Sequence, residues 1–335
     1  MNADDARLDP VESAGTVRRL PGLSDADLPF HGHHRVREHL LRETARDAGA
    51  APRPRFRRRP ALFLAAGAAT CAVALAVTLG VSGSDQRPPV ARTDPAAVQL
   101  LDRAALAAHA TPAPAVRDGQ FLYTRTTGHS TALSEAKGGR MEALRTDESA
   151  ERWVSVDGSS GTLTRTAKGT TTDPARGKDK ASINGPTYRF LESLPTDPDR
   201  LLEMVYADAR LNHGPASGSA TGPDHQAFVA IGDLLRTVEA PPGVSAALYR
   251  AAARIPGVVL VPEVTDAVGR KGVAVARIHD GERTEWIFDQ KTMRLLGERT
   301  VLLKDSAWGK AGTPVTSVAI VARGITTEAG QPPVH

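Results

Sequence analysis

The stretch "KGVAVARIHDGERTEWIFDQKTMRLLGERTVLL", residues 271–303, decides the fold of the larger part of this chain. Apolar and polar residues alternate along it over strand lengths, and Asp280-Gly281 is a strong signal for a two-residue hairpin turn. The flanking runs 257–264 and 315–326 are also apolar over strand lengths. The sequence therefore predicts a meander of about five antiparallel strands in the last third of the chain.

Strand patterns also occur upstream of this meander. Residues 119–128, 151–158 and 161–169 are rich in β-branched and aromatic residues, and Asp157-Gly158 predicts a tight turn between the last two runs. The stretch 168–185 has almost no apolar residue to bury, so we expect a mobile loop there.

Helical patterns separate the two groups of strands. An N-cap at Asp94 followed by Pro95 predicts a helix over 94–110, and apolar stripes predict three more over 194–210, 222–240 and 241–255. Strands, then helices, then strands indicate the α+β class. We expect residues 95–328 to form one α+β domain, with a curved antiparallel sheet like a half-barrel and helices covering one face, and 329–335 to be a disordered tail.

An apolar run precedes this domain. Residues 61–81 carry no charge and no proline, and as a helix they would span about 30 Å, the thickness of the hydrocarbon core of a bilayer. A cleaved signal peptide would have a shorter apolar stretch and far fewer residues before it. A helix buried in a soluble core would not have arginines at one end and a Pro-rich linker at the other. The sequence therefore predicts a transmembrane helix over 61–82, followed by a linker over 83–94.

The charges beside this run predict its orientation. Arginines cluster before residue 60, and the positive-inside rule places such a flank in the cytoplasm. Residues 1–60 would then be a largely disordered cytoplasmic segment with one short helix near 33–48, and the α+β domain would lie outside a single-pass cell membrane protein. The residues expected to anchor the chain are Arg55, Arg57, Arg58, Arg59, Leu62, Phe63, Leu64, Leu75 and Leu79.

Charge and composition exclude several partners. The first 60 residues hold 12 Arg against nine acidic residues, whereas the remainder is nearly neutral, so we expect no nucleic-acid partner. The histidines 31, 33, 34 and 39 fit a solvated polar stretch better than a metal site, and no cofactor motif is present. We therefore predict neither a metal nor a cofactor.

The sequence contains few candidate catalytic residues. Ser134 and Lys137 have the spacing of a serine–lysine pair, but the partner motifs of that enzyme class are absent. His279, Asp280 and Glu285 lie near the hairpin turn, where turn geometry favours Asp and the His is expected to be exposed. The three tryptophans, Trp153, Trp286 and Trp308, are expected in the core rather than around a lipid. We predict that the protein is not an enzyme.

Three motifs resemble a known family. The basic-flanked anchor, "LPTDPDRLL" (194–202) and the closing meander (272–298) resemble actinobacterial single-pass membrane proteins of unknown function that are often encoded beside extracytoplasmic-function sigma factors. The outer domain is also similar at the level of fold to the half-barrels of lipoprotein carriers and sigma-factor regulators. Zinc-type anti-sigma domains carry cysteines on their cytoplasmic part, and residues 1–60 have none. The sequence therefore excludes the zinc-binding type of anti-sigma domain.

This resemblance implies an extracytoplasmic binding or sensory domain that engages a lipid or protein ligand and regulates a cytoplasmic sigma factor through residues 1–60. Two alternatives stay open. One is an envelope carrier for a lipid or lipoprotein, and the other, less favoured, is a cell-envelope hydrolase.

Overall fold

A computed structural model describes residues 92–136, 140–175, 177, 181–213, 222–237 and 239–333. The predicted cytoplasmic segment, the predicted transmembrane helix with all nine anchoring residues, and the linker up to residue 91 lie outside these described residues. Within them, no helix has both the length and the apolar character needed to cross a membrane.

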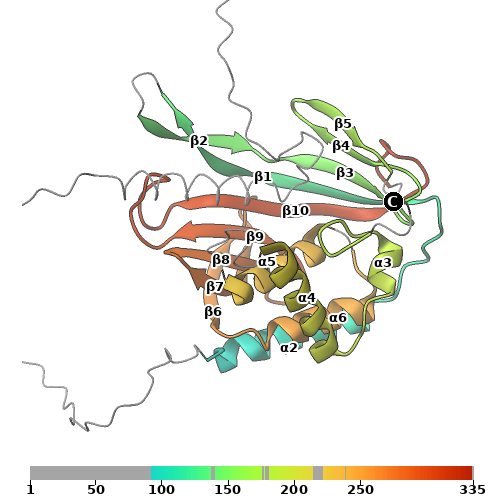
Figure 1. Cartoon of the computed structure of the whole chain (residues 1–335), viewed down its shortest axis with the longest axis horizontal. Coiled ribbons are helices and arrows are strands. Elements are labelled where there is room, and N and C mark those ends of the chain that lie inside the picture. The colour runs from blue at the N-terminus through green and yellow to red at the C-terminus, as the bar shows by residue number, and fades with distance from the viewer. Residues whose placement is uncertain are drawn as a thin grey trace, which may run out of the picture. The chain divides into compact units, whose positions relative to one another are not determined.

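The described residues form an α+β fold built on one large antiparallel sheet, which is open and strongly curved (Figure 1). The strand order is β5-β4-β3-β1-β10-β9-β8-β7-β6, and β2 pairs with β1 outside this path. This result confirms the predicted class and the predicted curved sheet with covering helices. The strands are β1 (Phe121–Glu135), β2 (Met141–Asp147), β3 (Ala150–Ser155), β4 (Thr162–Thr166), β5 (Gly169–Asp173), β6 (Val258–Thr265), β7 (Lys271–His279), β8 (Glu282–Phe288), β9 (Leu295–Leu302) and β10 (Pro314–Thr326).

The helices gather on one side of this sheet (Figure 1). The predicted cap of the first helix is confirmed, because the Asp94 carboxylate accepts a hydrogen bond from the Ala96 amide at 2.9 Å, and it also accepts one from the Leu260 amide of β6 at 3.2 Å. Asp94 therefore fixes the start of a helix to an edge strand. The helices are α2 (Pro95–Ala110), α3 (Tyr188–Glu192), α4 (Pro198–His213), α5 (Gly222–Thr237) and α6 (Pro242–Ala252).

The closing meander forms as predicted. Strands β6 to β10 are five in number, and the β7–β8 turn places Asp280 at φ 44° and Gly281 at φ 77°. Two consecutive positive φ angles are what a type I′ hairpin requires.

The first half of the sheet differs from the prediction in three places. Strand β1 is longer than expected, and it pairs at its far end with β2, an exposed strand whose sequence has no apolar alternation. The β3–β4 connection is a wider loop than the predicted two-residue turn, since β3 ends at Ser155 and β4 begins at Thr162. The predicted mobile loop contains β5 at 169–173, where threonines suit an edge strand although they bury little.

The main core lies between the sheet and the helices. The ring of Phe228 on α5 stacks on that of Trp286 on β8, with centroids 4.0 Å apart and planes 9° apart. Gly232, one turn further along α5, lies directly over the edge of the same indole. The three tryptophans are all buried, as predicted.

The last described residues lie against the opposite face of the sheet. The carbonyl of Gln331 accepts a hydrogen bond from the Trp153 indole at 2.8 Å, and that of Gly330 accepts one from Arg165 at 3.0 Å. The sequence predicts a disordered tail from residue 329, but these bonds hold its first residues against β3 and β4. The polar composition of the tail gives no sign of them, because its carbonyl groups make the contacts.

Candidate ligand-binding pocket

Strands β9 and β10 separate partway along their length. Strand β10 pairs with β1 as far as Thr326, whereas its pairing with β9 ends at Ala319 and Gly297. Where the two strands part, Arg270 donates hydrogen bonds to the carbonyls of Leu296 and Ile320, both at 3.0 Å. The Asp266 carboxylate holds this guanidinium at 2.6 Å. Residues 320–326 therefore run along β1 with no paired strand on their other edge.

A pocket of about 670 Å³ opens at this separation, and we call it the β9–β10 pocket. Its volume falls in the range of roughly 300–1,000 Å³ that is typical of small-molecule sites. Helices α2 and α6, the end of α5, the β8–β9 connection and the unpaired part of β10 all contribute walls. Its apolar lining comes chiefly from Ala104, Ala107, Ala108, Leu235, Ala240, Met293, Leu295, Leu296, Ile320 and Val321.

Arg323 brings a positive charge to this pocket. Its Nη2 donates to the carbonyls of Leu235 and Arg236, at 2.6 and 3.0 Å, in the last turn of α5. These carbonyls have no partner inside the helix, so Arg323 caps the C-terminus of α5. Its Nε is buried and makes no hydrogen bond, and no carboxylate in the described part of the chain lies within ion-pair distance of it. Burial lowers the pKa of Arg323, and the negative charge of Glu239 opposes this shift.

Tyr249 lines the same pocket from α6. Its side chain is only 6% exposed, and its ring packs against the ring of Phe288 on β8 at a centroid distance of 5.6 Å. The hydroxyl makes no hydrogen bond with any residue that the structure describes. Burial raises the pKa of Tyr249 to about 12, although the charge of Arg323 acts in the opposite direction. The hydroxyl is therefore protonated at neutral pH and can donate.

The remaining charged residues of the lining differ in how firmly they are held. Asp289 accepts hydrogen bonds from the amides of Thr292 and Lys291 in its own turn, at 2.7 and 3.0 Å, and the bonds from Thr292 lower its pKa most. Its carboxylate is thus already well satisfied. Arg294 is exposed and makes no ion pair with any described residue, and neither does Glu239. These two side chains and Arg323 are thus charged groups of the lining that form no ion pair with a described residue.

Several residues singled out from the sequence have structural positions instead. Ser134 is exposed on β1, and Lys137 lies outside the described residues. His279 stacks on His225 of α5, with ring centroids 4.9 Å apart. Glu285 is fully buried and forms ion pairs with Arg283 and Arg299 on the same face of the sheet.

The described residues contain no group of three or more potential ligands that could hold a metal ion. The four histidines at 31, 33, 34 and 39 lie outside them. None of the three tryptophans lines the β9–β10 pocket.

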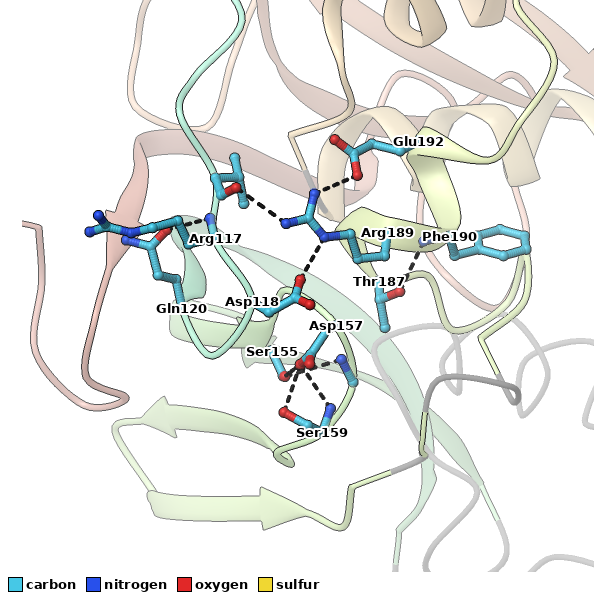
Figure 2. Close-up of polar contacts among 12 residues, drawn as sticks. Arg117, Asp118, Gln120, Ser155, Asp157, Ser159, Thr187, Arg189, Phe190 and Glu192 are labelled. Carbon is cyan, nitrogen blue, oxygen red and sulfur yellow. Dashed lines mark hydrogen bonds and ion pairs between the residues drawn. The ribbon is translucent and has the colours of Figure 1, made fainter.

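A second polar cluster joins the strands β1 and β3 to α3 (Figure 2). The Arg189 guanidinium donates to Asp118 at 2.7 Å and to Glu192 at 2.6 Å, and these bonds, that of Glu192 first, raise its pKa. Nearby, the Asp157 carboxylate accepts from the amide and the hydroxyl of Ser159, at 3.0 and 2.7 Å. Asp118 and Glu192 pair with Arg189, and Asp157 holds its own loop, so this cluster has the character of a structural support.

Sequence reasoning missed Arg323 and Tyr249. A signal for Arg323 exists, because it is the only charged residue in the strand-forming run 315–326. That signal is weak, because arginine is abundant throughout the chain. Tyr249 lies in an Ala-rich helical pattern in which an aromatic residue fits a core role equally well.

Comparison with known proteins adds nothing to this geometry: no protein-family model matches the chain, and no curated protein matches it.

Proposed function

We propose that this protein is a membrane-anchored binding protein whose α+β domain takes a small amphipathic molecule into the β9–β10 pocket. The observation that carries the proposal is the pocket itself, whose walls are apolar and polar in nearly equal share, with the polar side chains held on several elements. Such a combination is typical of small-molecule sites. The apolar walls would favour a hydrophobic portion of the ligand, and the polar side chains would orient its other end.

The membrane anchor is the second part of the proposal. An uncharged run long enough to span a bilayer, with arginines before it, supports a single-pass protein with a cytoplasmic N-terminus and an extracytoplasmic α+β domain. Protease added to intact cells should then digest the domain, and alkaline carbonate should leave the full-length chain in the membrane pellet. Protection of the domain from protease would overturn this topology.

The third part concerns residues 1–60. Their place at the inner membrane surface and the family resemblance support contact with a cytoplasmic sigma factor. Affinity capture with this segment should recover a sigma factor. A control version in which the five arginines at 53, 55, 57, 58 and 59 are changed to Gln should recover it as well. Capture of anionic lipid alone, lost in the Gln version, would contradict a regulatory role.

Native mass spectrometry of the purified full-length protein tests the binding function. We expect a co-purifying small amphiphile. Replacing Ala107 by Trp fills the pocket and should remove the bound mass, whereas Gln99→Trp places the same bulk on the exposed face of α2 and should retain it. Equal occupancy of both variants would show that the molecule binds elsewhere.

A lipid carrier is the second candidate, and the apolar lining favours it too. A carrier must pass its ligand to an acceptor, whereas a sensor retains it. Transfer of the co-purified amphiphile to protein-free vesicles within minutes would favour the carrier.

A further inference from the structure

We propose that the β9–β10 pocket selects molecules with an anionic head group, a carboxylate or a phosphate, which Arg323 and Tyr249 bind together. This inference rests on the proposed binding function and assigns the chemical class of the ligand.

The first step concerns the charge of Arg323. In the described part of the chain its hydrogen bonds go to two neutral carbonyls at the end of α5, its buried Nε has no partner, and no carboxylate forms an ion pair with it. The negative end of a helix dipole amounts to only about half an elementary charge. A full positive charge is thus held in a half-buried place with incomplete compensation, which is costly in a protein interior. An anion in the adjoining pocket would supply the missing charge.

The second step concerns Tyr249. Its ring is almost fully buried, whereas its hydroxyl oxygen is not among the buried atoms that lack a partner, so it reaches the open space of the pocket. The hydroxyl has no hydrogen-bond partner among the described residues, and a tyrosine with a buried ring usually has one. Because this hydroxyl stays protonated, it can donate to a carboxylate or phosphate oxygen but offers nothing to an ammonium group beyond a weak acceptor.

The two side chains come from different elements, Tyr249 from α6 and Arg323 from β10, and both line the β9–β10 pocket. A cation and a neutral donor in the walls of one pocket match an oxyanion with two acceptor oxygens. The Ala and Leu side chains of the walls would receive the apolar part of the same molecule.

Glu239 acts against this preference. It lines the pocket, makes no ion pair in the described part of the chain, and its charge stabilises that of Arg323. A carboxylate of the protein and a carboxylate of the ligand would then compete for one guanidinium. Removal of the charge of Glu239 should therefore strengthen anion binding, an effect that a purely apolar site would not show.

Photolabelling of the full-length protein in membranes tests the proposal. Three diazirine probes of equal alkyl length would be used, a fatty acid, an alkyl phosphate and a primary alcohol, and labelled peptides would be identified by mass spectrometry. We expect one or both anionic probes to label residues 104–114, 289–295 or 320–323 about tenfold more than the alcohol does, the ratio expected for one charge-assisted hydrogen bond. A preference for the fatty acid would indicate a free fatty acid as the ligand, and a preference for the phosphate would indicate a phosphate-headed lipid.

Four variants complete the experiment. Arg323→Met and Tyr249→Phe should reduce labelling by the anionic probes without changing labelling by the alcohol. Glu239→Gln should increase labelling by the anionic probes. Arg210→Met removes an exposed arginine of α4 and should change nothing. Glu239→Gln and Tyr249→Phe leave the cap of α5 in place, so they remain informative if Arg323→Met fails to fold.

Two outcomes would overturn the inference in different ways. Equal pocket labelling by all three probes, unchanged in Glu239→Gln and Tyr249→Phe, would contradict the preference for an anionic head group but would agree with the proposed binding function. Absence of pocket labelling by every probe would contradict both the preference and the binding function.

Discussion

Replacing Gly232 by Ala should destabilise the fold, although Ala is the better helix former. A Cβ at position 232 would lie 2.5 Å from Nε1 and 2.9 Å from Cε2 of Trp286, whereas an ordinary contact is 3.4–4 Å. The helix and the indole must therefore separate by about 1 Å. The ring cannot yield freely, because it is 1% exposed and stacks on Phe228.

The expected magnitude follows from two opposing contributions. Overpacking a well-packed core costs about 1–3 kcal/mol, and replacing Gly by Ala inside a helix regains about 1 kcal/mol. We expect a net loss of up to about 2 kcal/mol, which corresponds to a fall in Tm of up to roughly 4–8 °C for a domain of this size.

Gly243→Ala is the matched control. A Cβ there meets only the Thr196 methyl group at 3.5 Å, an ordinary contact, so the Tm should stay unchanged or rise by about 1–3 °C. The assay is thermal unfolding of the full-length protein followed by tryptophan fluorescence, since all three tryptophans lie in the α+β domain. If Gly232→Ala stabilised the protein as much as Gly243→Ala does, α5 would not pack on Trp286 in the way described.

Three further predictions concern stability. His129 accepts a hydrogen bond from Arg145 at Nδ1 (2.8 Å) and donates one from Nε2 to the Pro314 carbonyl, and burial lowers its pKa below 6.5. Its contribution to stability is therefore complete above about pH 6.5 and is lost as pH falls through the lower folded-state pKa. His129→Gln should flatten the dependence of Tm on pH between 7.5 and 5. An unchanged slope would argue against this role of His129. Glu285→Gln should lower the free energy of unfolding in urea by about 2–3 kcal/mol. This loss is smaller than that for a fully buried pair, because Arg283 and Arg299 are partly exposed. A loss under about 0.5 kcal/mol would refute the role of this pairing. Asp94→Ala removes bonds to Ala96 and Leu260 and should cost about 1–2 kcal/mol, with faster amide exchange at the start of α2; unaltered exchange there would contradict the cap.

The parts of the fold that could be predicted are those in which local sequence and burial agree. The Asp280-Gly281 turn and the cap at Asp94 depend on backbone geometry that few residues satisfy, and both are found. Strands β2 and β5 could not be predicted in this way. They are largely exposed and form because β1 and β4 offer them edges to pair with, which a local pattern does not record.

The candidate site could not be predicted for a related reason. The β9–β10 pocket exists because two paired strands part at Ala319, and the register of distant strands decides where that happens. Arg323 and Tyr249 are 74 positions apart in the sequence and meet only through this topology. The predicted anchoring residues, by contrast, follow from composition alone, and they stay a prediction.

Hydrogen exchange of the delipidated full-length protein, measured with and without added decanoic acid, tests most directly whether the β9–β10 pocket is a ligand site. We predict slower exchange in the peptides that cover residues 104–114, 289–295 and 320–323, and no change in β2 or in the β3–β4 loop. Unchanged exchange in all three peptides, with slower exchange elsewhere in the domain, would contradict the account.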